Sequence, residues 1–196
     1  TDEFQVSGAT ITGYTGTGTQ VYIPLVIGGT QITAIADGAF ANKQMETVTI
    51  TKNIASVGAG AFSGCLSLKK VIINEGEDDI SIGSNAFSGC PLLEHVELPK
   101  NVNTIGTTAF INCSDNLVLY EYDNSTVESY AAANNLELNN VGLFDFNNET
   151  GVFVSYHGAE SSVAIPDSLD GVEFTAIEDY AFLACETIET VTMPDT

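Results

Sequence analysis

Hydrophobic residues recur along the chain in a fixed order, with a period of 22–25 residues. The clearest mark of each period is an Ala-Phe pair, which is found at Ala39-Phe40, Ala61-Phe62, Ala86-Phe87, Ala109-Phe110 and Ala181-Phe182. An Ile or Val stands five residues before each Phe. A Cys stands three residues after it in every period except the first, where Lys43 takes its place. A repeat of this length is typical of solenoid architectures and organises the whole fold.

Each period ends in an apolar run that predicts a β-strand. Within Leu68–Ile73, the positions of Leu68, Val71 and Ile73 are apolar in the later periods too, whereas the positions between them vary. Such alternation indicates a strand with one buried face. The Ala-Phe-x-x-Cys stretch is too short for an independent helix, so we interpret it as a single helical turn that packs its Phe inward. Because one coil cannot bury its own apolar face, the coils are expected to stack into a parallel-stranded solenoid.

Two segments depart from the repeat and predict the ends of the stack. Ser125–Glu128 has the form of a capping box, which predicts a short helix over roughly Thr126–Asn134 that covers the last coil. At the other end, three alternating stretches separated by Gly-rich turns resemble a hairpin that leads into the stack: Phe4–Ser7, Thr10–Tyr14 and Gln20–Ile23.

A second, longer sequence repeat predicts the domain organisation. The segment from Phe4 to Phe40 aligns with the segment from Phe146 to Phe182 at a constant offset of 142 residues. We therefore predict a first array over residues 1–140, with a lead-in at 1–23, repeats at about 24–119 and a helical cap at about 120–140. Residues 141–196 are predicted to be the lead-in and first repeat of a second array. This second array is either truncated, in a piece of a longer protein, or closed by an imperfect natural cap.

The repeated series Ile-x-x-x-Ala-Phe-x-x-Cys-x-x-Leu-x-x-Val-x-Ile/Leu-Pro resembles the BspA-type leucine-rich repeat of bacterial surface proteins. The resemblance implies a right-handed leucine-rich-repeat solenoid, β-rich, with parallel-stranded coils, β-hairpin lead-ins and one short capping helix. It also implies export to the cell surface, and binding or adhesion rather than catalysis. The chain departs from the pattern at Lys43, after Ile50 and Ile73 (where the proline is missing) and after Cys113.

Charge narrows the classes of partner. The chain carries 26 acidic and 5 basic side chains, for a formal net charge of −21, and only 16% of its residues are charged. A protein this acidic is not expected to bind nucleic acid or an anionic membrane surface. No apolar run approaches the roughly 20 residues of a membrane-spanning helix, so we expect no direct membrane insertion.

Four cysteines in an exported protein could form disulfides, but their positions favour free thiols. Cys65, Cys90 and Cys113 occupy one repeat position, as does Cys185 in the second array, so they are expected to form a buried column. No Cys-x-x-Cys motif or nearby His accompanies them, so a metal cluster is not expected. We predict no cofactor.

Other candidate chemistry has weaker support. The acidic loop from Glu75 to Asp79 could hold calcium, but it lacks a recognised calcium-binding spacing and is more simply a solvated loop. The two histidines, His95 and His157, fall in different arrays, which leaves little basis for a catalytic triad, so we predict a protein that is not an enzyme. Glycosylation sequons begin at Asn112, Asn124 and Asn148, and Asn112 is expected to lie against the cysteine column, where a glycan would disrupt packing.

The best candidate for a binding surface is the solvent-facing side of the predicted strands. Its outward positions are Thr47, Thr49, Lys70, Ile72, His95 and Glu97. We expect an extracellular scaffold, secreted or attached to the bacterial surface, that uses this face to bind a host-matrix or bacterial-surface protein. The alternatives are a carbohydrate-binding module, with Tyr120 and Tyr122 as the nearest aromatic platform, and a spacer without a ligand of its own.

Overall fold

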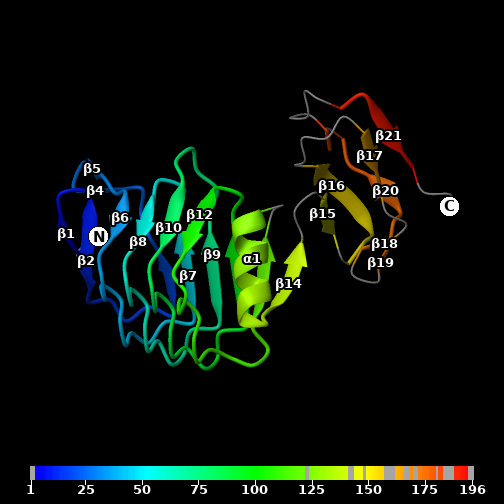
Figure 1. The fold of residues 1–196 in the computed structure, drawn as a ribbon. Helices are drawn as coiled ribbons and strands as arrows, with labels where there is room; N and C mark the ends of the chain where they lie inside the picture. The colour runs from blue at the N-terminus through cyan, green and yellow to red at the C-terminus, as the bar shows by residue number, and fades with distance from the viewer. Residues whose placement is uncertain are drawn as a thin grey trace. The chain divides into compact units, whose positions relative to one another are not determined.

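A computed structural model describes residues 3–121, 124–140, 144–147, 149–156, 162–165, 168–169, 172–179, 181–182 and 188–193. The chain divides into two compact units, Thr1–Asn139 and Asn140–Thr196. The first unit is a parallel-stranded solenoid with one helix, which confirms the predicted fold class (Figure 1). Among the described residues, no helix has the length and apolar character required to cross a membrane.

Two six-stranded sheets form the walls of the solenoid. Sheet A has the order β1 (Phe4–Ser7), β2 (Thr10–Tyr14), β6 (Ala34–Ile35), β8 (Ser56–Val57), β10 (Ile80–Ile82) and β12 (Val102–Ile105). Sheet B has the order β14 (Glu137–Asn140), β13 (Val118–Glu121), β11 (His95–Leu98), β9 (Lys70–Ile73), β7 (Thr47–Ile50) and β3 (Gln20–Tyr22). Each coil therefore supplies one short strand to each sheet. The Ala-Phe turn joins the two strands on one side of the coil.

The lead-in is shared between the sheets. β1 and β2 form the predicted antiparallel hairpin, and β2 pairs in parallel with β6. The third predicted stretch is not part of this hairpin, because β3 crosses to sheet B and pairs in parallel with β7. A small hairpin of β4 (Val26–Ile27) and β5 (Thr30–Gln31) connects the two regions.

The core of the first unit is a column of aromatic rings. Phe40, Phe62, Phe87 and Phe110 stack face to face, with ring centroids 4.8, 5.2 and 5.2 Å apart along the column. Tyr14 at one end and Tyr130 at the other continue the column, with centroids 5.2 and 5.9 Å from the terminal Phe rings. The inward Leu, Val and Ile positions of both sheets surround these rings and are buried.

The Ala-Phe turns stack through their own ladder of main-chain hydrogen bonds. The N–H groups of Phe40, Phe62 and Phe87 donate to the carbonyls of the Ala one coil further on, at 2.7, 2.7 and 2.8 Å. The residue two positions after each Phe has a left-handed backbone, with φ between 57° and 70°, and is Asn42, Gly64, Gly89 or Asn112. Gly and Asn tolerate this conformation best, which explains why these two residue types occupy this repeat position.

The helix α1 (Ser125–Asn134) covers the last coil and agrees with the predicted helix to within one residue. Its N-cap, however, is Asn124 and not Ser125. The Asn124 side chain accepts hydrogen bonds from the N–H groups of Thr126 and Val127, at 2.8 and 3.3 Å. Its amide also donates to the carbonyls of Pro99, Lys100 and Val102, at 3.3, 3.0 and 2.8 Å. Asn124 is thus the capping residue and also joins the helix to the loop between β11 and β12.

The second unit repeats the lead-in design. β15 (Phe144–Asn147) and β16 (Val152–Tyr156) form an antiparallel hairpin, and β16 pairs in parallel with β20 (Ala176–Ile177). β17 (Ser162–Ala164) pairs in parallel with β21 (Thr190–Thr192), while β18 (Ser168–Leu169) and β19 (Val172–Glu173) form a short hairpin. Phe153, Tyr156 and Phe182 make a smaller aromatic core, with centroids 5.3 and 6.0 Å from Phe182.

Candidate functional site

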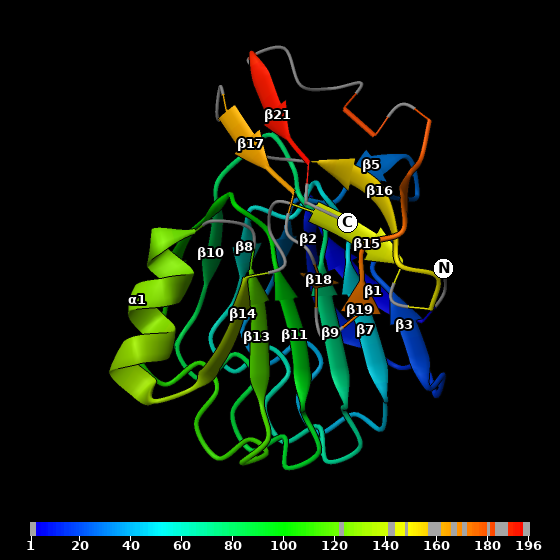
Figure 2. The same cartoon turned by 90° about the vertical axis from the view of Figure 1, so that its right-hand side faces the viewer.

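The predicted binding positions lie on β7, β9 and β11, which are neighbouring strands of sheet B (Figure 2). Parallel pairing places Thr47, Lys70 and His95 side by side in one row. It places Thr49, Ile72 and Glu97 in the next row, which Tyr22 on β3 and Tyr120 on β13 extend at its two ends. The strands therefore bring all six predicted residues onto one surface.

Charged and aromatic side chains on this face are locked together. The Oε1 atom of Glu97 lies 2.7 Å from Lys70 Nζ and 2.6 Å from His95 Nε2. The His95 ring stacks on Tyr120, with centroids 4.0 Å apart and planes 25° apart. The hydrogen bond from His95, together with the Lys70 ammonium, lowers the pKa of Glu97 against the opposing effect of burial. The result is a preorganised network across three strands.

Accessibility divides the six residues. Lys70, His95 and Glu97 are half-buried, with side chains 38%, 29% and 25% exposed, and Thr47 and Ile72 are in the same class. Thr49 is only 5% exposed, so it contributes almost no contact surface, contrary to its expected outward role. It is flanked by Tyr22 and Ile72 in the pairing register, and alternation alone does not report such coverage.

The structure gives little support to Tyr120 and Tyr122 as an aromatic platform for carbohydrate. One face of the Tyr120 ring is covered by His95, and Tyr122 lies outside the described residues. Tyr22, which sequence reasoning did not select, is 68% exposed at the β3 end of the face. Its signal is the outward position of Tyr22 in the alternating stretch Gln20–Ile23, which the pattern assigns to the lead-in and the structure places in sheet B.

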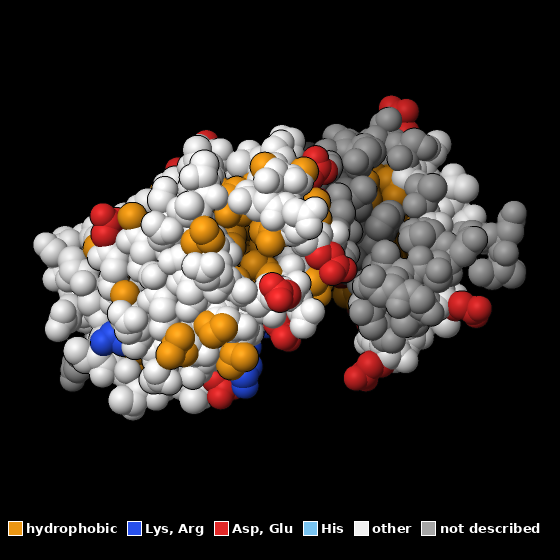
Figure 3. Space-filling model, turned by 60° about the horizontal axis from the view of Figure 1, so that its bottom comes forward, with side chains coloured by type: hydrophobic (Ala, Val, Ile, Leu, Met, Phe, Trp, Pro, Cys, Tyr) orange, Lys and Arg blue, Asp and Glu red, His pale blue; other side chains and the backbone are white. Residues whose placement is uncertain are grey.

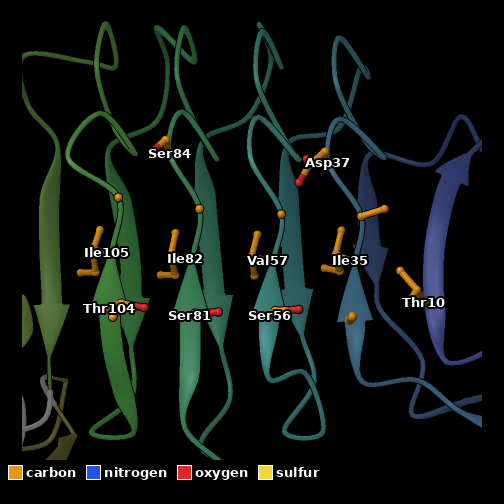
Figure 4. Close-up of a pocket in the computed structure, with 15 residues that line it drawn as sticks. Thr10, Ile35, Asp37, Ser56, Val57, Ser81, Ile82, Ser84, Thr104 and Ile105 are labelled. Carbon is orange, nitrogen blue, oxygen red and sulfur yellow. The ribbon is translucent and has the colours of Figure 1, made fainter.

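A second surface, missed from the sequence, lies on the outer face of sheet A. It is a trough of about 620 Å³ across four coils (Figure 4). Ser56, Ser81 and Thr104 occupy one register position on successive strands. The sequence signal was a small residue directly after the repeated Ile or Val, namely Ala36, Gly58, Gly83 and Gly106.

Packing between coils accounts for these small residues. A Cβ atom added at Gly58, Gly83 or Gly106 would stand 2.5, 2.7 or 2.5 Å from a main-chain nitrogen of the preceding coil. Real Cβ atoms do not approach backbone this closely, so the backbone would have to shift. The floor of the trough is therefore set by the close approach of neighbouring coils.

The cysteine column has the expected location. Cys65 and Cys90 are fully buried and Cys113 is partly buried, and all three are free thiols. Each Sγ donates to the carbonyl of the preceding coil's Phe, at 3.1, 3.3 and 3.2 Å. Burial raises the pKa of Cys113 to about 11. Cys185 lies outside the described residues.

The other candidates are the acidic loop and His157. Within the described part of the chain, no group of three or more His, Cys, Asp or Glu side chains is placed to hold a metal ion. In the acidic loop, Glu75 pairs with Lys100 at 2.9 Å, and Asn103 donates to Asp79 at 3.0 Å. His157 is not among the described residues.

The sequons differ in accessibility. Asn112 lies beside Cys113 as expected, but the residue is exposed, so the expectation that a glycan there would disrupt the packing is wrong. Asn124 is buried and bonded on all sides, so it cannot accept a glycan in the folded protein. Asn148 falls outside the described residues.

Comparisons with solved structures return several bacterial leucine-rich repeat proteins. One from Bacteroides capillosus is 23% identical with a TM-score of 0.48, and the alignment covers 61% of this chain and 98% of that one. The leucine-rich repeat protein of T. pallidum is 20% identical with a TM-score of 0.46, covering 98% and 83%. A leucine-rich cell surface protein from Faecalibacterium prausnitzii is 18% identical with a TM-score of 0.41, covering 93% and 71%.

Comparison with curated proteins finds no match. The sequence model of the BspA-type leucine-rich repeat region matches residues 25–139 and 156–196, with six copies. These two ranges contain most of the chain, including every Ala-Phe turn and both sheets' repeated strands. The chain belongs to the BspA-type leucine-rich repeat family.

Proposed function

We propose that this protein is an extracellular, non-enzymatic scaffold that binds a protein partner through the outer face of sheet B. The network of Lys70, Glu97, His95 and Tyr120 is the observation that carries the proposal. Family membership supports an interaction or scaffold role and a location at the bacterial surface. The partner is a host-matrix or bacterial-surface protein.

The chemistry of the face suits protein recognition. Half-buried ionic groups that are already oriented lose little conformational freedom on binding, and they discriminate between partners through their charge pattern. Ile72 lies beside them, and the exposed Tyr22 ring ends the same row. Aromatic side chains of this kind commonly act as interface anchors.

The few basic side chains of this acidic protein are unevenly distributed along the chain. Figure 3 shows, on the face that it presents, mostly uncharged side chains with scattered acidic groups and few basic ones. All five basic residues are lysines between Lys43 and Lys100, in the repeats that carry the network. A partner can therefore meet both signs of charge on sheet B, but mainly negative charge elsewhere.

The test compares two sets of substitutions on the two sheets. In the first, Lys70→Ala, Ile72→Ala, His95→Ala and Glu97→Ala are combined on sheet B. In the matched control, Ser56→Ala, Ser81→Ala and Thr104→Ala are combined on the outer face of sheet A. Purified proteins are used to capture host-matrix and bacterial-surface proteins, and the captured proteins are then measured by surface plasmon resonance.

We expect the sheet B variant to bind at least about tenfold more weakly, because several central contacts are lost together. The control should bind like the parent chain. Binding that survives the sheet B substitutions would show that this face is not the interface. A parent chain that captures no protein would support the spacer alternative instead.

A further inference from the structure

A separate pocket lies where the solenoid ends. It has a volume of about 470 Å³ and is bounded by the last Ala-Phe turn and by the C-terminal part of α1. Its lining includes Phe110, Ile111, Asn112, Asp115, Asn134 and Leu136. It is distinct from the sheet B face and from the trough on sheet A.

The pocket occupies the place of the next coil's turn. In the earlier coils, the N–H group two residues after each Phe donates to the following coil. Gly64 donates to the Ser88 carbonyl at 2.8 Å, and Gly89 donates to the Ile111 carbonyl at 2.9 Å. The N–H of each earlier Phe also donates to the following coil, whereas the N–H of Phe110 donates to the hydroxyl of Tyr130, at 3.3 Å. Asn112 holds the position of Gly64 and Gly89, and within the described residues its N–H has no acceptor.

The pocket therefore presents a main-chain donor that a ligand oxygen can satisfy. Asn112, Asn134, Asn135 and Asp115 also line the pocket. The Asn134 amide donates one hydrogen bond to the Tyr130 carbonyl, at 2.9 Å, and keeps its second N–H and its oxygen for a ligand. Amides and carboxylates offer the donors and acceptors that sugar hydroxyls require. Ile111, which is 48% exposed, and Leu136 supply apolar surface for C–H groups.

The same lining argues against other ligands. No basic side chain lines the pocket, and the chain carries a net charge of −21, so an acidic sugar or a phosphate would be repelled. The polar groups outnumber the apolar ones, which does not suit the hydrophobic anchor of a peptide.

We propose that this pocket binds a neutral N-acetylated sugar residue. The acetamido carbonyl accepts the hydrogen bond of the Asn112 N–H, as a carbonyl of a following coil would. The hydroxyl groups bond to Asp115 and to the asparagine amides, and the sugar's C–H face packs on Ile111 and Leu136. This site is independent of the sheet B face, so either proposal can fail without the other.

The first experiment titrates the full chain with N-acetylglucosamine and follows main-chain and side-chain amides by NMR. We expect saturable shifts of the Asn112 amide and of the Asn134 and Asn135 side chains. Glucose, which lacks the acetamido group, should bind several-fold more weakly, as expected for the net loss of one hydrogen bond. Equal binding of glucose or glucuronic acid, tighter binding of N-acetyl-dialanine amide, or no shift at these residues would overturn the proposal.

Variants then separate the site from the fold. Asn112→Gly removes the side chain but keeps the left-handed backbone, whose φ is 57°. Asp115→Ala removes the carboxylate. Each should weaken N-acetylglucosamine binding several-fold. Asn42→Gly is the matched control, since Asn42 has the same turn position in the first coil and a φ of 59°, and it should leave binding unchanged.

The cysteine column supplies an independent readout. Cys113 lines the pocket and is partly buried, whereas Cys65 and Cys90 are fully buried in the coils behind it. Because the pKa of Cys113 is raised to about 11, alkylation is followed at alkaline pH by mass spectrometry of the Cys113 peptide. N-acetylglucosamine should slow this alkylation in the parent chain, and at the same subsaturating concentration it should protect Asn112→Gly less. Protection that is equal in both proteins would count against the site.

Discussion

The two outer faces of the first unit are built by the same coils, yet they differ in what limits their side chains. On sheet A, the positions after the repeated Ile or Val are small in every coil, because a neighbouring backbone fills the space. On sheet B, the outward positions change from Thr47 to Lys70 to His95 along one row. Nothing in the stacking of coils requires those residue types.

The difference separates positions that packing between coils fixes from positions that it leaves variable. Uniform small residues on sheet A report the geometry of the stack, and the trough follows from it. On sheet B the residue types vary, and a set of contacts links Lys70, Glu97, His95 and Tyr120. These two observations are the basis of the proposed recognition role. Repetition in a solenoid marks structure, and departure from repetition marks candidate recognition.

The sharpest way to break this comparison is to enlarge a residue on sheet A. In Gly83→Ala, the new Cβ would stand 2.7 Å from Ala59 N, 2.8 Å from Gly58 C and 3.0 Å from Ala59 Cα, all of them main-chain atoms. Since backbone cannot move aside as a side chain does, we expect a loss of about 3 kcal/mol in the free energy of unfolding. Urea denaturation followed by circular dichroism measures it.

A glycine elsewhere in the same coil serves as the control. Gly89 has a φ of 67°, and an added Cβ would meet its nearest atoms at 3.9 Å. Asn occupies the equivalent position as Asn42 and Asn112. Gly89→Asn should therefore cost only a few tenths of a kcal/mol, on the order of other tolerated left-handed Asn residues. If both variants lose equal stability, steric contact between coils is not what keeps sheet A small.

An intermediate effect is expected at Asn124, where the loop between the two sheets meets the cap. Asn124→Ala removes both acceptor bonds to the first turn of α1 and the bonds to three loop carbonyls. The helix loses its cap and the loop carbonyls lose their donor, so the free energy of unfolding should fall by about 2 kcal/mol. Thermal unfolding measures it, with Asn103→Ala, an exposed amide bonded to Asp79, as the control. Equal melting temperatures for the two variants would contradict this role of Asn124.

Most of the fold could be predicted because the same buried positions recur in every repeat. The Phe column, the cysteine column and the parallel strands all follow from residues that recur at one spacing. The capping residue occurs once, and there the pattern misled: Ser125 to Glu128 matched a capping box, but Asn124 can reach both the helix and the loop carbonyls. The identity of a capping residue that depends on tertiary contacts cannot be predicted from the local sequence pattern.

The candidate binding face could be predicted in outline and not in detail. Alternation placed Lys70, His95 and Glu97 outward, but it did not reveal that Glu97 bonds to both of the others. Nor did it show that Thr49 is covered and Tyr22 exposed, because these depend on neighbouring strands. The pocket beside Asn112 could not be predicted from the sequence for a related reason. It exists because the helix replaces a coil, and its open donor is a main-chain group with no signature in the sequence.

The smallest expected effect concerns sheet B itself. The folded protein lowers the pKa of Glu97, through the hydrogen bond with His95 and the Lys70 ammonium, so its ionised form stabilises the fold. This contribution is fully present above the unfolded pKa of about 4.3 and is lost as the pH falls through the lower folded value. Because the side chain is 25% exposed, we expect less than about 1 kcal/mol. The difference in unfolding free energy between the parent chain and Glu97→Gln should thus be largest near neutral pH and vanish at strongly acidic pH. Urea titrations between about pH 3 and 7 measure it, with Glu94→Gln as a control of equal charge change. A difference that does not change with pH would mean that the network fixes no charge, and sheet B would then differ from sheet A in composition alone.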